Sequence, residues 1–233
     1  PVFINIRPDT FNIDEAKIEE AITPKTKAIL CVHYAGVSCE MDAILAIAKR
    51  HQLLVIEDAA QGIDSYYNHQ ALGTIGDLGT FSFHATKNII SGEGGALLVN
   101  NQDLIQRAEI IWEKGTNRKR FLLGEVDKYS WVDVGSSYVP SEITAAFLYA
   151  QLQSIHTITE RRLHLWNLYH QALESLENQE KLRRPIVPNN CQHNAHLYHI
   201  LLPDMEQRNA LMFHLREKGI QAVAHYVPLH DSE

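Results

Sequence analysis

The alternation of strand and helix patterns over the first 115 residues most constrains the fold of this chain. Apolar runs of strand length occur at Lys27–Val32, Leu53–Glu57, Gly79–Phe83 and Ala96–Asn100, and helical patterns at Met41–Gln52 and Gln102–Lys114. The run at Leu53–Glu57 is nearly all apolar, as in a strand buried on both faces of a parallel sheet. The alternation predicts an α/β fold with a mostly parallel sheet covered by helices on both sides.

The remaining segments are expected to add a strand, several helices and a small second domain. We expect a strand at Val2–Ile6, a helix at Asp14–Ile22 capped by Asp14, helices from Ser141 to Leu176, a strand at Ala195–Leu202, a helix at Met205–Lys218 and a strand at Gln221–Val227. This predicts residues 1–140 as part of a large domain, 141–184 as linking helices and 185–233 as the start of a small α+β domain. Because the chain starts without Met and stops just after an apolar run, we expect a fragment missing both ends.

Composition and charge argue against several classes of partner. The 21 basic and 28 acidic residues give a net charge of −7, which disfavours nucleic acid or an anionic membrane as the main partner. No apolar run approaches the roughly 20 residues of a membrane helix. Three cysteines without Cys-x-x-Cys spacing predict reduced thiols in a cytoplasmic protein. His193, His196 and His199 recur every third residue, but the expected strand points His196 and His199 to opposite faces, so no metal site is predicted.

A carboxylate and an amine each lie at the end of a predicted strand. Asp58 follows one apolar run and Lys87 lies just past another, and ligands of such sheets bind beyond the carboxyl ends of strands. Together they can hold pyridoxal 5′-phosphate, because the amine forms a Schiff base with its aldehyde while the carboxylate keeps the ring nitrogen protonated. Ser82 offers a hydroxyl to the phosphate, and Gly92, Gly94 and Gly95 let the backbone approach and turn. Gln61 can reach the ring hydroxyl or stack near it.

Simpler interpretations exist for each of these residues. Taken alone, Lys87 is typical of a surface loop, and Asp58 of a helix cap, a metal ligand or a structural partner. Glu57 alternates to the opposite face and is expected to be structural. The basic run Arg118-Lys119-Arg120 is typical of a solvated face, with anion binding as the minority interpretation. No GxxxxGK[ST], GxGxxG or GxSxG motif occurs, so neither a nucleotide-phosphate loop nor a hydrolase elbow is predicted.

Three segments, VIEDAAQ, FSFHATKNIISGEGGALLV and YVPLH, resemble the DegT/DnrJ/EryC1/StrS aminotransferases, which have the aspartate aminotransferase fold of type I. The resemblance implies that Lys87 is the Schiff-base lysine, Asp58 the partner of the pyridine nitrogen, Gln61 a contact near the ring hydroxyl and Ser82 a phosphate ligand. Many relatives carry an asparagine that reaches the phosphate of the partner subunit's cofactor, and Ser137 stands at that place here. Tyr226 and His230 would line the substrate pocket.

The resemblance also implies an activity. A cytoplasmic homodimer with shared active sites would move the amino group of L-glutamate to a dTDP-4-keto-6-deoxy-sugar. The product would be a dTDP-4-amino-4,6-dideoxy-sugar for cell-surface polysaccharide. Three alternatives stay open: a sugar dehydratase of the same family, in which histidine replaces the lysine; a non-catalytic, regulatory protein that binds pyridoxal phosphate; and a lysine Schiff-base aldolase without that cofactor.

Overall fold

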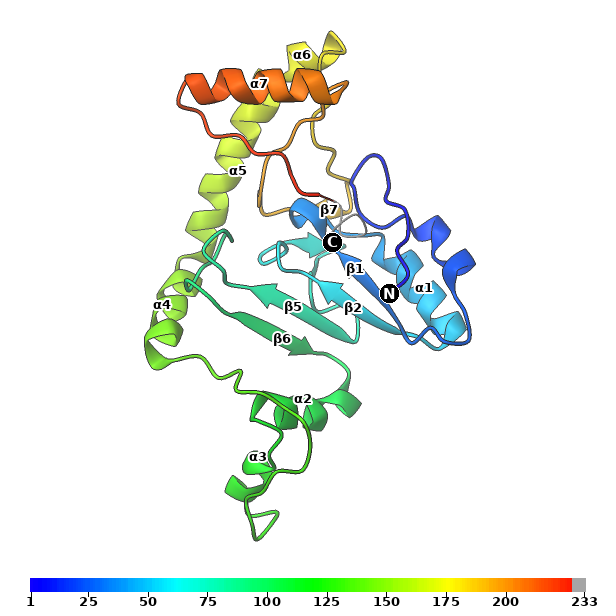
Figure 1. Ribbon diagram of the computed structural model, residues 1–233, viewed down its shortest axis with the longest axis vertical. Coiled ribbons are helices and arrows are strands. Elements are labelled where there is room, and N and C mark those ends of the chain that lie inside the picture. The colour runs from blue at the N-terminus through cyan, green and yellow to red at the C-terminus, as the bar shows by residue number, and fades with distance from the viewer. Residues whose placement is uncertain (228–233) are drawn as a thin grey trace.

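A four-stranded mixed sheet forms the centre of the computed structural model, which describes residues 1–227 (Figure 1). Its strands are β1 (Ala28–Val32), β2 (Leu54–Asp58), β5 (Leu78–Ser82) and β6 (Gly95–Val99), in the order β1-β2-β5-β6. The first three run parallel, and β6 pairs antiparallel with β5. The predicted α/β fold is confirmed, and each strand lies within one residue of its predicted bounds.

The core lies between this sheet and helix α1 (Met41–His51). Met41, Ile44 and Ile47 of the helix are buried against the inward-facing residues of β1 and β2, among them Ile29 and Val55. The opposite face of the two strands is exposed, because no described helix lies over Leu30, Val32 and Leu54. The prediction that both faces are covered, and that β2 is buried on both, is therefore wrong for the described residues.

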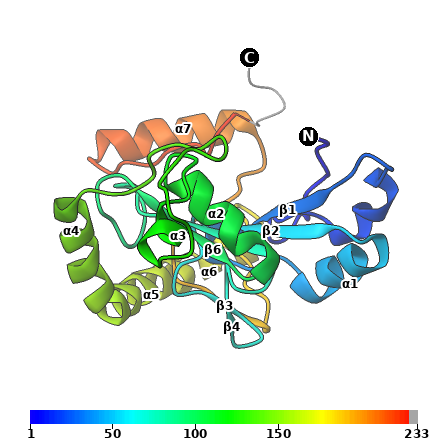
Figure 2. The ribbon, with the colours of Figure 1, turned by 90° about the horizontal axis from the view of Figure 1, so that it is seen from below.

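A second, smaller sheet was not predicted. It consists of β3 (Tyr66–Tyr67), β4 (Gln70–Ala71) and β7 (Cys191–Gln192), in the antiparallel order β4-β3-β7. Figure 2 shows β3 and β4 as a hairpin that extends from the body of the molecule. Through β7, this hairpin ties the chain near residue 191 to the first half of the molecule.

The other α-helices follow strand β6 in the chain. They are α2 (Ile105–Trp112), α3 (Arg118–Leu122), α4 (Glu142–Gln153), α5 (Ile155–Ala172), α6 (Glu174–Asn178) and α7 (Met205–Glu217). Ser141 caps α4, as predicted, because its hydroxyl accepts a hydrogen bond from the Thr144 amide at 3.2 Å. In Figure 1, α2 and α3 lie at one end of the molecule and α5, α6 and α7 toward the other. None of the described helices is long and apolar enough to cross a bilayer.

Three predicted strands are absent from the described residues. The segment at 2–6 makes only an isolated bridge between Ile6 and Ile13, the segment at 195–202 makes only one between Leu201 and Arg183, and the segment at 221–227 makes none. An extended chain becomes a strand only when a neighbouring backbone pairs with it over several residues, and within residues 1–227 no backbone pairs with these segments beyond the two single bridges.

Short 3₁₀ turns occur where a regular helix was predicted near the N-terminus. The segment from Asp14 forms η1 (Glu15–Lys17) and η2 (Glu19–Ala21), with the Asp14 carboxylate accepting from the Ala16 amide as the predicted cap. Two further 3₁₀ turns are η3 (Tyr34–Gly36) and η4 (Gln102–Leu104).

Candidate active site

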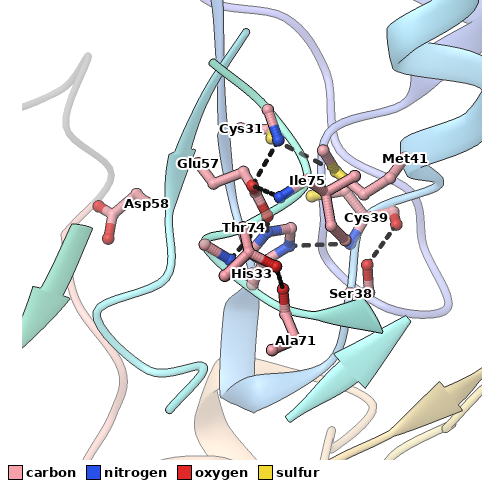
Figure 3. Close-up of polar contacts among 12 residues, drawn as sticks. Cys31, His33, Ser38, Cys39, Met41, Glu57, Asp58, Ala71, Thr74 and Ile75 are labelled. Carbon is pink, nitrogen blue, oxygen red and sulfur yellow. Dashed lines mark hydrogen bonds and ion pairs between the residues drawn. The ribbon is translucent and has the colours of Figure 1, made fainter. Parts of the chain in front are cut away.

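Two adjacent carboxylates at the end of β2 face opposite ways. Successive strand residues point to opposite faces of a sheet, and Figure 3 shows Asp58 turned away from the buried cluster around Glu57. The Glu57 side chain has no exposed surface, whereas Asp58 is half-buried. Because successive residues alternate along the strand, Glu57 is directed into the core while Asp58 is accessible to a ligand.

Glu57 is held by four hydrogen-bond donors (Figure 3). One oxygen accepts from His33 Nε2 at 2.9 Å and the Gly73 amide at 2.8 Å, and the other from the Ile75 and Gly76 amides, both at 2.7 Å. Burial raises the pKa of Glu57, but the His33 and amide hydrogen bonds outweigh it, so the pKa is lowered overall. This arrangement supports the structural role expected for Glu57.

Asp58 and Ser82 lie at the carboxyl ends of neighbouring strands. Asp58 pairs in register with Thr80, and Ser82 ends β5 two residues later. The Asp58 Oδ1 atom accepts from the Ala60 amide at 3.0 Å, and its other oxygen has no hydrogen-bond partner in residues 1–227. Ser82 Oγ accepts a long hydrogen bond of 3.4 Å from the His84 amide, which leaves its own O–H able to donate.

Gln61 lies beside the turn that follows β1. Its side-chain oxygen accepts from the Ala35 amide at 2.7 Å, and its backbone oxygen accepts from Asn194 Nδ2 at 2.9 Å. The first contact fixes the plane of the amide and leaves its NH₂ group as a donor. The predicted contact with a ring hydroxyl stays a prediction that this orientation permits.

Lys87 lies in the bend that follows β5, where its backbone amide donates to the His84 carbonyl at 2.9 Å. The half-buried side chain forms no ion pair with any described carboxylate. Two histidines lie within its electrostatic influence. The pKa of His196 is lowered to about 4 and that of His225 is also lowered, in both cases mainly by burial and to a smaller extent by the Lys87 charge.

The glycine-rich loop folds back against β5 at the same edge of the sheet. The Phe83 amide donates to the Gly94 carbonyl at 2.9 Å, and the Ala85 amide to the Gly92 carbonyl at 3.0 Å. Gly92 and Gly94 have φ values of 85° and 137°, which other residues rarely adopt. The predicted turn with positive φ is therefore present beside Lys87.

Other residues named from the sequence lie away from this group or outside the description. Ser137 is exposed and forms an isolated bridge with Glu113 beyond α2, with no contact to Asp58 or Lys87. Tyr226 is exposed, and its ring lies 3.8 Å from that of His225. His230 lies outside the described residues.

The basic run in α3 is matched by acidic neighbours. Arg118 contacts Glu113 at 3.0 Å, Lys119 pairs with Glu109, and Arg120 contacts Glu125 at 3.2 Å. All three basic side chains are about half exposed. These pairs favour the solvated-face interpretation over anion binding.

Four residues around this edge had no signal in the sequence. The Tyr34 hydroxyl contacts His225 Nδ1 at 2.7 Å across 191 positions of sequence. Asn88 and Asn194 form buried hydrogen bonds between loops that are more than 100 residues apart. No spacing rule connects such distant positions, and only the fold brings them together. Within the described residues, no group of three or more His, Cys, Asp or Glu side chains could hold a metal ion.

The donor set fits pyridoxal phosphate. Among residues 1–227, one edge of the sheet carries an amine without an ion-pair partner, a carboxylate with one unpartnered oxygen, a hydroxyl that can donate and a glycine turn. These are the groups needed by an aldehyde, a ring nitrogen and a phosphate. An ion pair with a carboxylate would hold the Lys87 amine away from an aldehyde, and no described carboxylate forms one.

Curated relatives match nearly the whole chain. GDP-perosamine synthase of Caulobacter vibrioides is 36% identical over 234 residues, which cover 99% of this chain and 60% of that protein. The uncharacterised protein MJ1066 of Methanocaldococcus jannaschii is 38% identical over 236 residues, with the same coverage. The chain thus spans about 60% of the length of the curated relatives it matches.

Solved structures agree with the fold. DesV of S. venezuelae, in complex with a ketimine intermediate, has a TM-score of 0.87 and 31% identity, covering 100% of this chain and 59% of its own. Spr1654 of Streptococcus pneumoniae, in its PLP form, has a TM-score of 0.86 and 25% identity, covering 98% and 62%. The family model matches residues 1–233. The chain therefore belongs to the DegT/DnrJ/EryC1/StrS aminotransferase family, whose cofactor is pyridoxal 5′-phosphate, as predicted from the sequence.

Proposed function

We propose that the protein is an aminotransferase that moves the amino group of L-glutamate to a keto-sugar nucleotide. The observation that carries this proposal is the position of Lys87. Its amine has no ion-pair partner among the described residues. Its backbone lies in the loop that follows β5, at the sheet edge that also carries Asp58, Gln61 and Ser82.

Pyridoxal phosphate supplies, when bound, an aldehyde and an electron-accepting ring that together allow an amino group to move between two carbon atoms. The free oxygen of Asp58 would accept the N–H of the pyridine ring and keep that nitrogen protonated. The Ser82 hydroxyl would donate to the phosphate, and the Gln61 NH₂ group would lie near the ring hydroxyl. Lys87 Nζ would hold the cofactor between turnovers and carry the proton that leaves Cα of the amino donor.

For the substrate, we propose a dTDP-4-keto-6-deoxy-sugar. The segments HATKNIISGEGGALLVNN and YSWVDVGSSYVPSEITAAFLYAQL resemble the dTDP-4-amino-4,6-dideoxygalactose transaminase of enterobacterial common antigen synthesis. Tyr226 and His230 are proposed to line the sugar pocket. Because GDP-perosamine synthase is also a relative, full-length protein should be assayed with dTDP- and GDP-linked keto sugars side by side, and turnover of only the GDP-linked sugar would contradict this choice.

We also propose a homodimer with shared active sites. Large apolar side chains are exposed along the segment that includes Ser137: Trp131 is 76%, Val134 82% and Ile143 83% exposed. Such a patch is typical of a protein–protein interface. Ser137 would contact the phosphate of the partner subunit's cofactor. Sedimentation of the full-length protein should give the mass of two chains, and the mass of a single chain would contradict the dimer.

A cytoplasmic location is proposed on the state of the cysteines. Cys31, Cys39 and Cys191 are all free and buried. Free thiols are typical of proteins in a reducing compartment.

The test of the proposed function is Lys87→Ala in the full-length protein. The substitution removes the amine that would form the Schiff base, so we expect no release of 2-oxoglutarate from L-glutamate and no change in the absorbance of added pyridoxal phosphate. Lys49→Ala, an exposed lysine of α1, serves as the matched control and should retain full turnover. Transamination by Lys87→Ala would exclude the proposed role, and a wild-type protein that binds the cofactor without releasing 2-oxoglutarate would favour the regulatory or dehydratase alternatives.

A further inference from the structure

Asn194 joins two loops near the candidate active site from within the protein. Its side chain has no exposed surface, and its Nδ2 atom donates to the Gln61 carbonyl at 2.9 Å and the Ile63 carbonyl at 2.7 Å. These partners lie more than 130 positions earlier in the sequence. A single side chain thus fixes the backbone that carries Gln61.

The backbone of Asn194 is attached to the loop that carries Lys87. Asn88, the residue after Lys87, is buried, and its Nδ2 atom donates to the Asn194 carbonyl at 2.9 Å. The Asn88 Oδ1 atom then remains as an acceptor and lies 3.0 Å from His196 Nδ1. Because this oxygen can only accept, the ring proton of a neutral His196 lies on Nδ1. Two contacts therefore tie the Lys87 loop to the same short segment.

This segment is also held from helix α5. Arg162 donates from Nε to the Ala195 carbonyl at 3.1 Å and from Nη2 to the His196 carbonyl at 2.5 Å. The carbonyls of three consecutive residues, Asn194, Ala195 and His196, each accept a side-chain hydrogen bond. The segment is thereby a fixed point to which the Gln61 loop, the Lys87 loop and α5 all attach.

The surroundings of Asn194 indicate that its position matters more than its contribution to stability. The Oδ1 atom is buried and has no hydrogen-bond partner in the described structure, which is unfavourable in itself. Gly36 lies against this atom with φ of 79°, and a Cβ there would be only 2.2 Å from Oδ1. The unsatisfied oxygen of the Asn194 amide is unfavourable, but its NH₂ group donates two hydrogen bonds, to the carbonyls of residues 61 and 63.

We propose that Asn194 and Asn88 are positioning residues that hold the Lys87 loop in register with the Gln61 loop. This inference rests on the proposed function, because the distance between Lys87 and the groups around Gln61 affects the rate only if they act together on one cofactor. Neither asparagine needs to touch the cofactor or substrate. A shift of about 1 Å between reacting groups can lower a rate by on the order of 100-fold.

The experiment compares three asparagine variants of the full-length enzyme. Asn194→Ala and Asn88→Ala should each lower kcat by about 10- to 100-fold and leave the KM for L-glutamate within about threefold. The double variant should be little worse than either single variant, since both break the same link. Asn100→Ala is the matched control, because the Asn100 amide also donates to two carbonyls, those of Gly73 and Gly76, but at the opposite edge of the sheet. It should leave kcat unchanged.

A second readout does not depend on activity. In cofactor-free protein, amide hydrogen exchange of residues 83–92 should be faster in Asn194→Ala than in wild type, and unchanged in Asn100→Ala. The inference is wrong if Asn194→Ala lowers the unfolding midpoint as Asn100→Ala does but alters neither kcat nor exchange in this loop. If Asn194→Ala does not fold, Asn88→Ala decides by the same two readouts. Failure of the proposed function would appear separately, as wild-type protein whose Lys87 is not labelled by pyridoxal phosphate and borohydride.

Discussion

At the scale of single residues, the pair Glu57 and Asp58 shows what a sequence can and cannot tell. Their adjacency in a strand predicts that they face opposite sides, and the structure confirms it. The sequence does not show that Glu57 is fully buried or that its donors are His33 and the amides of residues 73–76. Those partners come from separate loops, so no local pattern encodes them.

Replacing Glu57 by glutamine should destabilise the protein by about 3 kcal/mol. Each carboxylate oxygen accepts two N–H groups, and the NH₂ group of glutamine would face two of those donors instead of accepting from them. Urea unfolding of the full-length protein measures the change. The control is Glu20→Gln, which alters an exposed pair with Lys17 at 3.6 Å and should cost less than about 0.5 kcal/mol. Equal effects at the two sites would contradict the assigned role of Glu57.

At the scale of elements, hydrophobic periodicity predicted the helix and the strands that pack one apolar face against the core. Helix α1 was predicted at 41–52 from its apolar stripe, and the structure has it at Met41–His51 with that stripe buried. The four long strands were predicted because their apolar runs are long enough to be distinctive. The two-residue strands β3, β4 and β7 are too short for any period. The segments at 195–202 and 221–227 have strand-like composition, but within the described residues they pair at most through the single bridge between Leu201 and Arg183.

The end of α1 offers a stabilising substitution. Gln52 adopts a left-handed conformation with φ of 54° while its amide donates to the carbonyls of Ala48 and Lys49. Glycine adopts this conformation without steric cost, so Gln52→Gly should stabilise the protein by about 0.5–1 kcal/mol. Gln151→Gly, in the interior of α4, should have the opposite sign and cost about 1 kcal/mol. Urea midpoints of the two variants test both signs, and a loss of stability in Gln52→Gly would show that its side chain contributes more than the strain costs.

At the scale of the whole molecule, the segment 191–199 connects parts that the sequence separates. It adds β7 to the small sheet, carries Asn194 between the Gln61 loop and the Lys87 loop, and packs His193 against Trp166 of α5, with ring centroids 4.6 Å apart. The prediction of a strand at 195–202 was wrong for the described residues, because the carbonyls of residues 194–196 accept from side chains instead of from a neighbouring strand. The path of this segment depends on contacts between residues that are more than 100 positions apart in the sequence. Local sequence patterns do not contain such contacts, so they could not predict it.

The same segment should make stability depend on pH. The pKa values of His193, His196 and His199 are each lowered to about 4, mainly by burial. Neighbouring positive charges make the smaller contribution: His170 at His193, Lys87, Arg162 and His225 at His196, and Arg183 and His225 at His199. An unfolded chain has histidine pKa values near 6.5, so between pH 6.5 and about 4 the unfolded state binds more protons than the folded state. Stability should therefore fall as the pH decreases through this window and stop falling from this source below it.

The share of that dependence that one histidine contributes can be measured. Each of these half-buried histidines contributes at most about 1.4 kcal/mol per pH unit, and its partial exposure reduces this value. His199 lies outside the proposed Lys87 contacts, and its Nδ1 atom is buried without a hydrogen-bond partner in the described structure. His199→Asn removes its titration, so the free energy of unfolding, measured in urea from pH 4.5 to 6.5, should change less steeply than in wild type. An unchanged slope would mean that His199 is protonated to the same extent in the folded and unfolded states. In that case the partial burial of its side chain would not lower its pKa.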